Sequence, residues 1–142
     1  MLSAGLVLHG ASGETRKEIE RALGSTEFGT LIRQIESDSS IESANKIYLA
    51  NGFTLKQNYQ QTVAVIFKSE AQSVNFGDSV GTKKIINDWV EDNTHGLIKD
   101  FVKGLDADIT ALVVNAIYFK GNWVTPLELQ DYNKRDFHHS KS

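Results

Sequence analysis

The sequence predicts an α+β protein, because it combines one long strand that is apolar on both sides with several segments of helical periodicity. The strand is Ala111–Phe119, in which alternate side chains are apolar in both directions. The clearest helix is Lys83–Asn93. Its apolar stripe consists of Ile85, Ile86, Trp89 and Val90.

Composition limits the class of protein. The 142 residues are 40% hydrophobic and 23% charged, with a formal net charge of -3, which is ordinary for one soluble domain. This balance favours neither nucleic-acid binding nor a membrane surface, and no apolar run reaches the roughly 18 residues of a membrane span.

The absence of cysteine excludes disulfides, a thiol nucleophile and a cysteine metal site. The opening residues lack a basic segment, so they make a poor secretory signal.

Two helices are expected at the start of the chain. Residues Leu2–Leu8 are apolar or small, and the run His9–Gly13 is typical of a helix end. A second helix is expected to begin at Thr15, with Glu18 completing a capping box, and to stop at Gly24.

The middle of the chain alternates between helix and strand. The spacing of apolar residues predicts a helix at Phe28–Ile35 and, after the polar loop Ser37–Ser40, a weakly alternating strand at Ala44–Leu49. Helical periodicity returns at Gln57–Phe67, and a further strand is expected at Ala71–Phe76.

The regions on either side of the amphipathic helix are interpreted as loops. Gly77–Lys83 holds glycines and a lysine but lacks Walker A spacing. Gly96 is placed for a left-handed helix cap. The segment Leu97–Leu105 is expected to lie against the protein, because its apolar side chains would otherwise be exposed. Beyond Trp123 we expect a turn at Pro126 and a charged tail.

One polar residue, Asn115, interrupts the long strand. An unpaired amide among apolar neighbours would cost about 1 to 3 kcal/mol, so Asn115 must have partners. It is either a core asparagine that fixes the strand register or a polar latch in a sheet that opens. Because neither face of the strand is polar, we expect it inside a sheet that is covered on both faces.

No enzyme chemistry is predicted. None of the histidines has a metal-ligand partner at usable spacing, and His138-His139 is interpreted as solvated. No serine lies in a G-x-S-x-G sequence, and no Ser/His/Asp set can be argued. The Phe28–Ile35 helix has Arg33 as its only basic residue, which does not support a heparin-type site. No metal or other cofactor is implied.

Four stretches, taken in order, resemble the serpin family of serine protease inhibitors. They are Ser43–Tyr48 with Gly52-Phe53; Phe67–Ala71 with Val74–Phe76; Ile86–Val90 with Thr94, Gly96, Ile98 and Asp100; and Val114–Trp123 with Pro126 and Asp136-Phe137-His138. The resemblance implies strands 2, 1 and 3 of serpin sheet A, with helix F across the sheet face. It covers residues 1–142 as one incomplete domain. That domain starts within helix B and lacks helix A and the C-terminal half with the reactive centre loop.

The resemblance also implies a conformational switch. In the family, a protease cleaves the reactive loop, which then inserts as a new strand into sheet A. By this comparison Asn115 matches the shutter, where a polar cluster holds the sheet closed, and its partners are expected on segments outside this chain. Gly121 belongs to the same switch region, and Trp123 matches the breach. The helix across the sheet must shift for insertion. The residues that define it are Ile86, Asn87, Trp89 and Val90.

The implied function is that of a fragment of a serine-type endopeptidase inhibitor, which is not inhibitory by itself because the reactive loop is absent. The alternatives are a non-inhibitory serpin-fold binding, carrier or storage protein, and an inactive truncated product. A serine protease is the implied partner of a full-length member only. The implied location is extracellular by family habit, although intracellular serpins are common. If the long strand is central, ending the chain at Ser142 leaves a strand edge uncovered, which predicts an insoluble or oligomeric chain.

Overall fold

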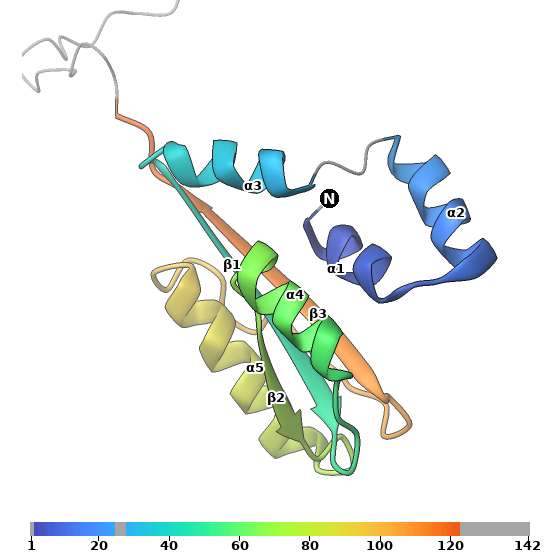
Figure 1. Cartoon of the computed structure of the whole chain (residues 1–142). Helices are drawn as coiled ribbons and strands as arrows, with labels where there is room; N and C mark the ends of the chain where they lie inside the picture. The colour runs from blue at the N-terminus through green and yellow to red at the C-terminus, as the bar shows by residue number, and fades with distance from the viewer. Residues whose placement is uncertain (1, 25–27, 123–142) are drawn as a thin grey trace, which may run out of the picture.

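The computed structural model describes residues 2–24 and 28–122, and it shows helices on both faces of a small sheet (Figure 1). The elements are α1 (Leu2–Gly10), α2 (Gly13–Leu23), α3 (Phe28–Ser37), β1 (Ile41–Ala50), α4 (Gln57–Phe67), β2 (Glu70–Val74), α5 (Ser79–Asn93) and β3 (Ala111–Phe119). This arrangement confirms the predicted α+β class. The expected turn at Pro126, the charged tail and His138-His139 lie outside the described residues.

Within the described part of the chain, the sheet has three strands in the order β2-β1-β3. β1 pairs in parallel with β2, placing Lys46 opposite Glu70, and antiparallel with β3, placing Asn45 opposite Asn115. Two adjacent parallel strands need a crossover connection, and α4 supplies it. The weakly alternating segment is therefore the central strand, and it is longer than predicted.

The prediction that Ala111–Phe119 lies inside a sheet is wrong for the described residues, because β3 is an edge strand there. Its two apolar faces have another cause. Val113 packs against the core on one face of the sheet, and Val114 belongs to the core on the other.

Two hydrophobic cores lie on opposite faces of the sheet because alternate β1 side chains point in opposite directions. Ile47 and Leu49 join the core under α1 and α4. Tyr48 joins the core under α5. The first core consists of Leu6, Leu8, Ile47, Leu49, Val63 and Phe67, and the second of Tyr48, Val74, Phe76, Ile86, Val90 and Val114.

The start of α2 differs from the predicted capping box. Ser12 occupies the N-cap position without a side-chain cap bond, and Thr15 already lies within the helix. Gly13 has φ +59°, a backbone angle that glycine tolerates, and it lets the chain turn from α1 directly into α2. The predicted stop is confirmed, since Gly24 forms a left-handed cap whose N–H bonds to Glu20 O.

The start of α5 also differs from the prediction, because the helix begins at Ser79 and the interpretation of Gly77–Lys83 as a loop is wrong in its second half. Asp78 is the N-cap, and its Oδ1 accepts from Gly81 N–H at 3.0 Å. Thr82 is buried, whereas Ile85 of the predicted stripe is 40% exposed. The buried face of α5 therefore consists of Thr82, Ile86 and Val90, and it is rotated around the helix axis from the face that the sequence predicts.

The end of α5 is a Schellman-type cap. Gly96 N–H bonds to Glu91 O at 2.8 Å and His95 N–H to Asp92 O at 3.4 Å. Gly96 has a positive φ as predicted, but His95 does too. In the segment that follows, Val102 packs into the core under α5, whereas Leu97 is 74% exposed, so the expected burial of this segment holds only in its second half.

Candidate functional site

Asn115 has its hydrogen-bond partners on β1. Its Nδ2 donates to Asn45 Oδ1 at 3.0 Å, to Ala44 O at 3.3 Å and to Ser43 Oγ at 3.4 Å. The prediction that Asn115 needs partners is confirmed. The expectation that they lie outside this chain is wrong for these three, because the β1–β3 register brings them beside it.

Asn45 connects this contact to α4. Asn45 is 9% exposed, and its Nδ2 donates to Phe67 O, at the last residue of α4, at 3.1 Å. A helix leaves its final carbonyls without partners inside the helix, and a side-chain donor from a neighbouring strand can bond to such a carbonyl. The two asparagines thus link α4, β1 and β3. The sequence placed Asn45 within a motif but gave it no role.

The outer edge of β3 pairs with no strand among residues 28–122. Two side chains near its end, Ile117 and Phe119, are 52% and 66% exposed. An apolar strand with a free edge is a template for another strand. The chain therefore presents Asn115 on a strand whose other side is open to pairing.

α5 lies across the sheet face opposite α4, as predicted (Figure 1). Ile86 and Val90 are buried against that face, and Trp89 is half-buried beside them. Asn87 faces the segment that leads back to β3. Its Nδ2 donates to Val102 O at 3.1 Å, and its Oδ1 accepts from Val102 N–H at 2.7 Å. The helix and its return segment are thus joined by two bonds from one side chain.

The carboxyl end of α5 contacts both long strands. His95 Nε2 lies 3.0 Å from Glu42 on β1, and the His95 ring meets the Tyr118 ring on β3 at 4.3 Å. Both side chains of the ion pair are more than half exposed, so the pair contributes little to stability. It marks where the helix end rests on the sheet.

Tyr48 is fully buried beneath α5, and its hydroxyl has no hydrogen-bond partner within the described residues. Burial raises the pKa of Tyr48 to about 12. A buried hydroxyl without a partner costs free energy, so the contact between α5 and the sheet is not optimised for stability.

The remaining predicted switch residues lie just beyond β3. Gly121 is exposed, and a Cβ there would come within 2.7 Å of the Phe119 ring. The structure therefore places Asn115 within the sheet and α5 against one face of that sheet. Trp123 is not among the described residues.

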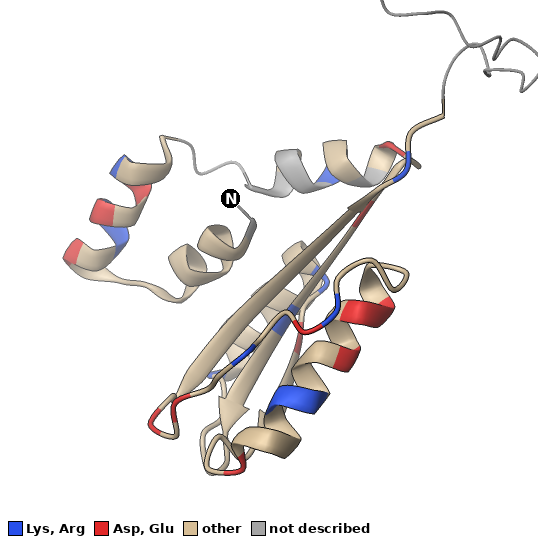
Figure 2. Cartoon of the chain, turned by 180° about the vertical axis from the view of Figure 1, so that it is seen from behind, with Lys and Arg blue, Asp and Glu red and all other residues tan. Residues whose placement is uncertain are grey.

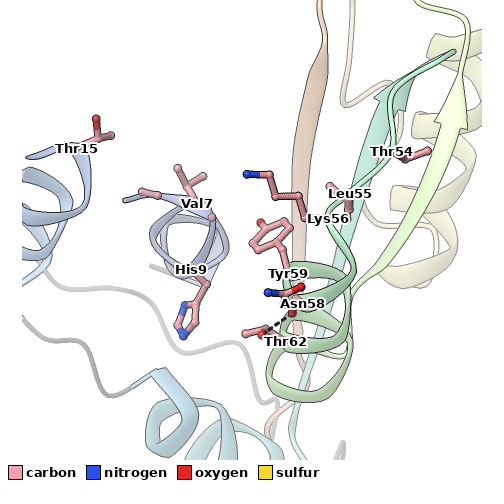
Figure 3. A pocket seen from close by; sticks show the side chains of 11 residues that line it. Val7, His9, Thr15, Thr54, Leu55, Lys56, Asn58, Tyr59 and Thr62 are labelled. Carbon is pink, nitrogen blue, oxygen red and sulfur yellow. Dashed lines mark hydrogen bonds between the residues drawn. The ribbon is translucent and has the colours of Figure 1, made fainter. Parts of the chain in front are cut away.

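An open pocket of about 700 Å³ lies between the end of α1 and the start of α4 (Figure 3). Val7, His9, Lys56 and Tyr59 contribute to its wall. The Tyr59 hydroxyl already donates to Leu6 O at 2.8 Å. No Asp or Glu is among the described residues that line this pocket.

Charged side chains of both signs occur on α2 and α5; they alternate along α2, whereas in α5 the lysines lie in the first half and the acidic residues in the second (Figure 2). Arg16 pairs with Glu20, and Lys84 with Asp88. In the part of the chain that the structure describes, no three His, Asp or Glu side chains gather as a metal site. No described helix has both the length and the apolar character needed to cross a bilayer.

Comparison with known proteins adds to this geometry. The family model for Serpin (serine protease inhibitor) matches residues 1–142. Antichymotrypsin-2 of Bombyx mori is 37% identical over 92% of this chain and 38% of its own length, and neuroserpin of Gallus gallus is 36% identical over 99% and 37%. The chain thus spans less than two fifths of these curated relatives.

Solved structures agree on the fold. Cleaved Serpin 42Da superposes with a TM-score of 0.81 at 32% identity, covering 92% of this chain and 37% of that one. Lamprey angiotensinogen, solved with its reaction loop cleaved, gives 0.78 at 33% identity, covering 91% and 40%. The fold is that of an α+β protein, and in the residues that the structure describes its helix-covered sheet ends at the unpaired outer edge of β3.

The chain belongs to the serpin family, which confirms the resemblance drawn from its sequence. Serpins are in general protease inhibitors and not catalytic enzymes. The order β2-β1-β3 corresponds to strands 1, 2 and 3 of serpin sheet A, and α5 corresponds to helix F.

Proposed function

We propose that this chain is the part of a serine-type endopeptidase inhibitor that forms one wall of an expandable sheet, and that it acts together with a reactive loop supplied from outside these 142 residues. The observation that carries this proposal is the free outer edge of β3, which pairs with no described strand while Asn115 ties its inner side to β1. A strand that is held on one side and open on the other is suited to accept a new neighbour.

The proposed mechanism is suicide inhibition. The serine of the protease attacks a peptide carbonyl in the reactive loop, the new amino end leaves, and an ester joins protease and inhibitor. The freed loop then enters sheet A beyond β3 as an added strand, carrying the bound protease with it. The reaction-loop-cleaved form of a similar protein supports loop cleavage as the event that precedes this state.

The test is to incubate the natural protein that carries this sequence with proteases of trypsin-like and chymotrypsin-like specificity. The proposal predicts an adduct that survives boiling in SDS and contains peptides from residues 28–122. Cleavage of the loop without an adduct would contradict inhibition and would favour the alternative of a serpin-fold binding, carrier or storage protein.

We further propose that the 142-residue chain alone neither inhibits nor catalyses. It would leave the rate of a trypsin-like protease unchanged, and it would turn over no ester or peptide substrate. A measurable slowing of the protease, or turnover that co-purifies with the chain, would contradict this.

The proposed partner is a serine protease encountered outside the cell, in keeping with the habit of the family. The presence of both signs of charge on α2 and α5, and a single basic residue in α3, support an account without nucleic acid, membrane or heparin as partners. Immunodetection in the culture medium of producing cells tests the location, and detection only inside the cells would contradict it.

A further inference from the structure

Three polar residues stand in a row across the sheet on the face that α4 covers. Asn115 on β3 is opposite Asn45 on β1. The register pairs Lys46 of β1 with Glu70, the first residue of β2, so continuing that register by one residue aligns Ser69 with Asn45, although Ser69 itself lies outside β2. Ser69 is 3% exposed, and its hydroxyl has no partner among the described residues.

Asn45, in the middle of this row, has a fixed side-chain amide orientation. Its Nδ2 donates to Phe67 O at 3.1 Å, so its Oδ1 points to the other side, where it accepts from Asn115 Nδ2 at 3.0 Å. A reversed amide would set its oxygen against the Phe67 carbonyl and its NH₂ group against the donor of Asn115. Both contacts would then repel. The α4 carbonyl thus decides which atom Asn45 presents to β3.

The two asparagines do not have equal roles in this network. Asn45 bonds to two elements other than its own strand, whereas the side-chain bonds of Asn115 within the described residues all go to β1. Losing the Asn115 side chain leaves the bond from Asn45 to α4 in place. Losing the Asn45 side chain removes its bond to Phe67 O of α4 and its bond to Asn115 of β3 together.

We propose that Asn45 is the positioning residue of the sheet switch, which transmits the placement of the α4 carboxyl end to Asn115 and so holds β3 in its closed alignment. Its effect on strand insertion rests on the proposed function. Its coupling of α4 to β3 does not. The nearby Ser69 hydroxyl is buried and has no hydrogen-bond partner among the described residues.

The coupling is tested by hydrogen exchange with mass-spectrometric readout on the longer protein that carries these 142 residues. Asn45→Ala should raise exchange about tenfold both in β3 and at the α4–β2 junction, residues 66–70. Asn115→Ala should raise it in β3 and leave the junction unchanged. Asn58→Ala, an exposed asparagine on α4, is the matched control and should change neither.

A merely structural role for Asn45 gives a different pattern. Exchange would then rise throughout the chain, including α2 and α5, or it would rise in β1 and β3 without the junction. Either result would overturn the proposal. An effect of Asn115→Ala at the junction equal to that of Asn45→Ala would also overturn it, because Asn45 would then have no greater role than Asn115 in linking α4 to β3.

The consequence for insertion is tested in the longer protein that carries this chain. Each single alanine variant should speed conversion to the strand-inserted form about tenfold, and the double variant should add less than about twofold, because the two residues act in series. Fully additive rates would contradict positioning. If the wild-type protein never inserts a strand while the exchange pattern holds, the proposed function fails and the coupling stands.

Discussion

Asn87 on α5 holds Val102 by two hydrogen bonds, accepting from its N–H at 2.7 Å and donating to its carbonyl at 3.1 Å. One side chain thereby replaces a strand partner for the return segment. Asn87→Ala should release residues 98–106, lower the free energy of unfolding by about 1 to 3 kcal/mol and raise hydrogen exchange in that segment.

The matched control for this change is Asn93→Ala, because Asn93 donates only within its own helix, to Trp89 O at 2.7 Å. Its effect on the return segment should be absent. Equal exchange in the two variants would show that Asn87 does not join the segment to the helix.

The buried Tyr48 hydroxyl makes stability depend on alkaline pH. Burial raises the pKa of Tyr48 to about 12, above the roughly 10 of an unfolded chain. Between these values the folded form keeps a proton that the unfolded form releases, so stability is constant below about pH 10 and falls as the pH rises further.

Tyr48→Phe removes both the orphan hydroxyl and this titration. At pH 7 the variant should be more stable by about 1 kcal/mol, because the hydroxyl has no hydrogen-bond partner among residues 2–24 and 28–122. Its urea midpoint should fall less between pH 9 and 11. Some alkaline loss should remain, since burial also raises the pKa of Tyr59. A variant that is less stable than wild type at pH 7 would mean that the hydroxyl is bonded.

Asp78 sets the start of α5 through its bond from Gly81 N–H. Asp78→Ala should cost about 1 kcal/mol in thermal or urea unfolding, and Asp78→Ser should retain most of the cap. Asp92→Ala, at the other end of the same helix, serves as the control. It should be neutral or slightly stabilising, because a carboxylate is unfavourable near a helix carboxyl end. Equal losses at both ends would rule out a capping role.

The exposed end of β3 predicts self-association of the 142-residue chain. Ile117→Lys with Phe119→Lys places charge on an open apolar edge and should reduce association in light scattering, with stability changed by no more than about 0.5 kcal/mol per residue. Val80→Lys, at a residue 76% exposed on α5, should leave association unchanged. A monodisperse wild-type monomer would contradict the prediction.

Local signals predicted much of the fold. Gln57–Phe67 and Ala111–Phe119 have the predicted bounds, because apolar periodicity changes sharply at both ends of each element. The loop predicted at Gly77–Lys83 is wrong from Ser79 onward, because glycines alone indicate a loop whereas Asp78 caps a helix that includes Gly81.

The site could be predicted only in part. The need of Asn115 for partners follows from its apolar neighbours, but its partner Asn45 lies 70 residues away in sequence. Pairing of the two depends on strand register, and a single sequence does not specify register across such a separation. The edge position of β3 was missed for a related reason, since apolar faces report burial by helices as well as by neighbouring strands.

The central claim is that this chain works as one wall of a larger inhibitor, and the most direct measurement is the intact mass of the natural protein, captured with an antibody against residues 83–93. The account predicts a mass well above the 15.8 kDa of these 142 residues. A mass of 15.8 kDa would contradict it, because a chain of that size brings no reactive loop to the free edge of β3.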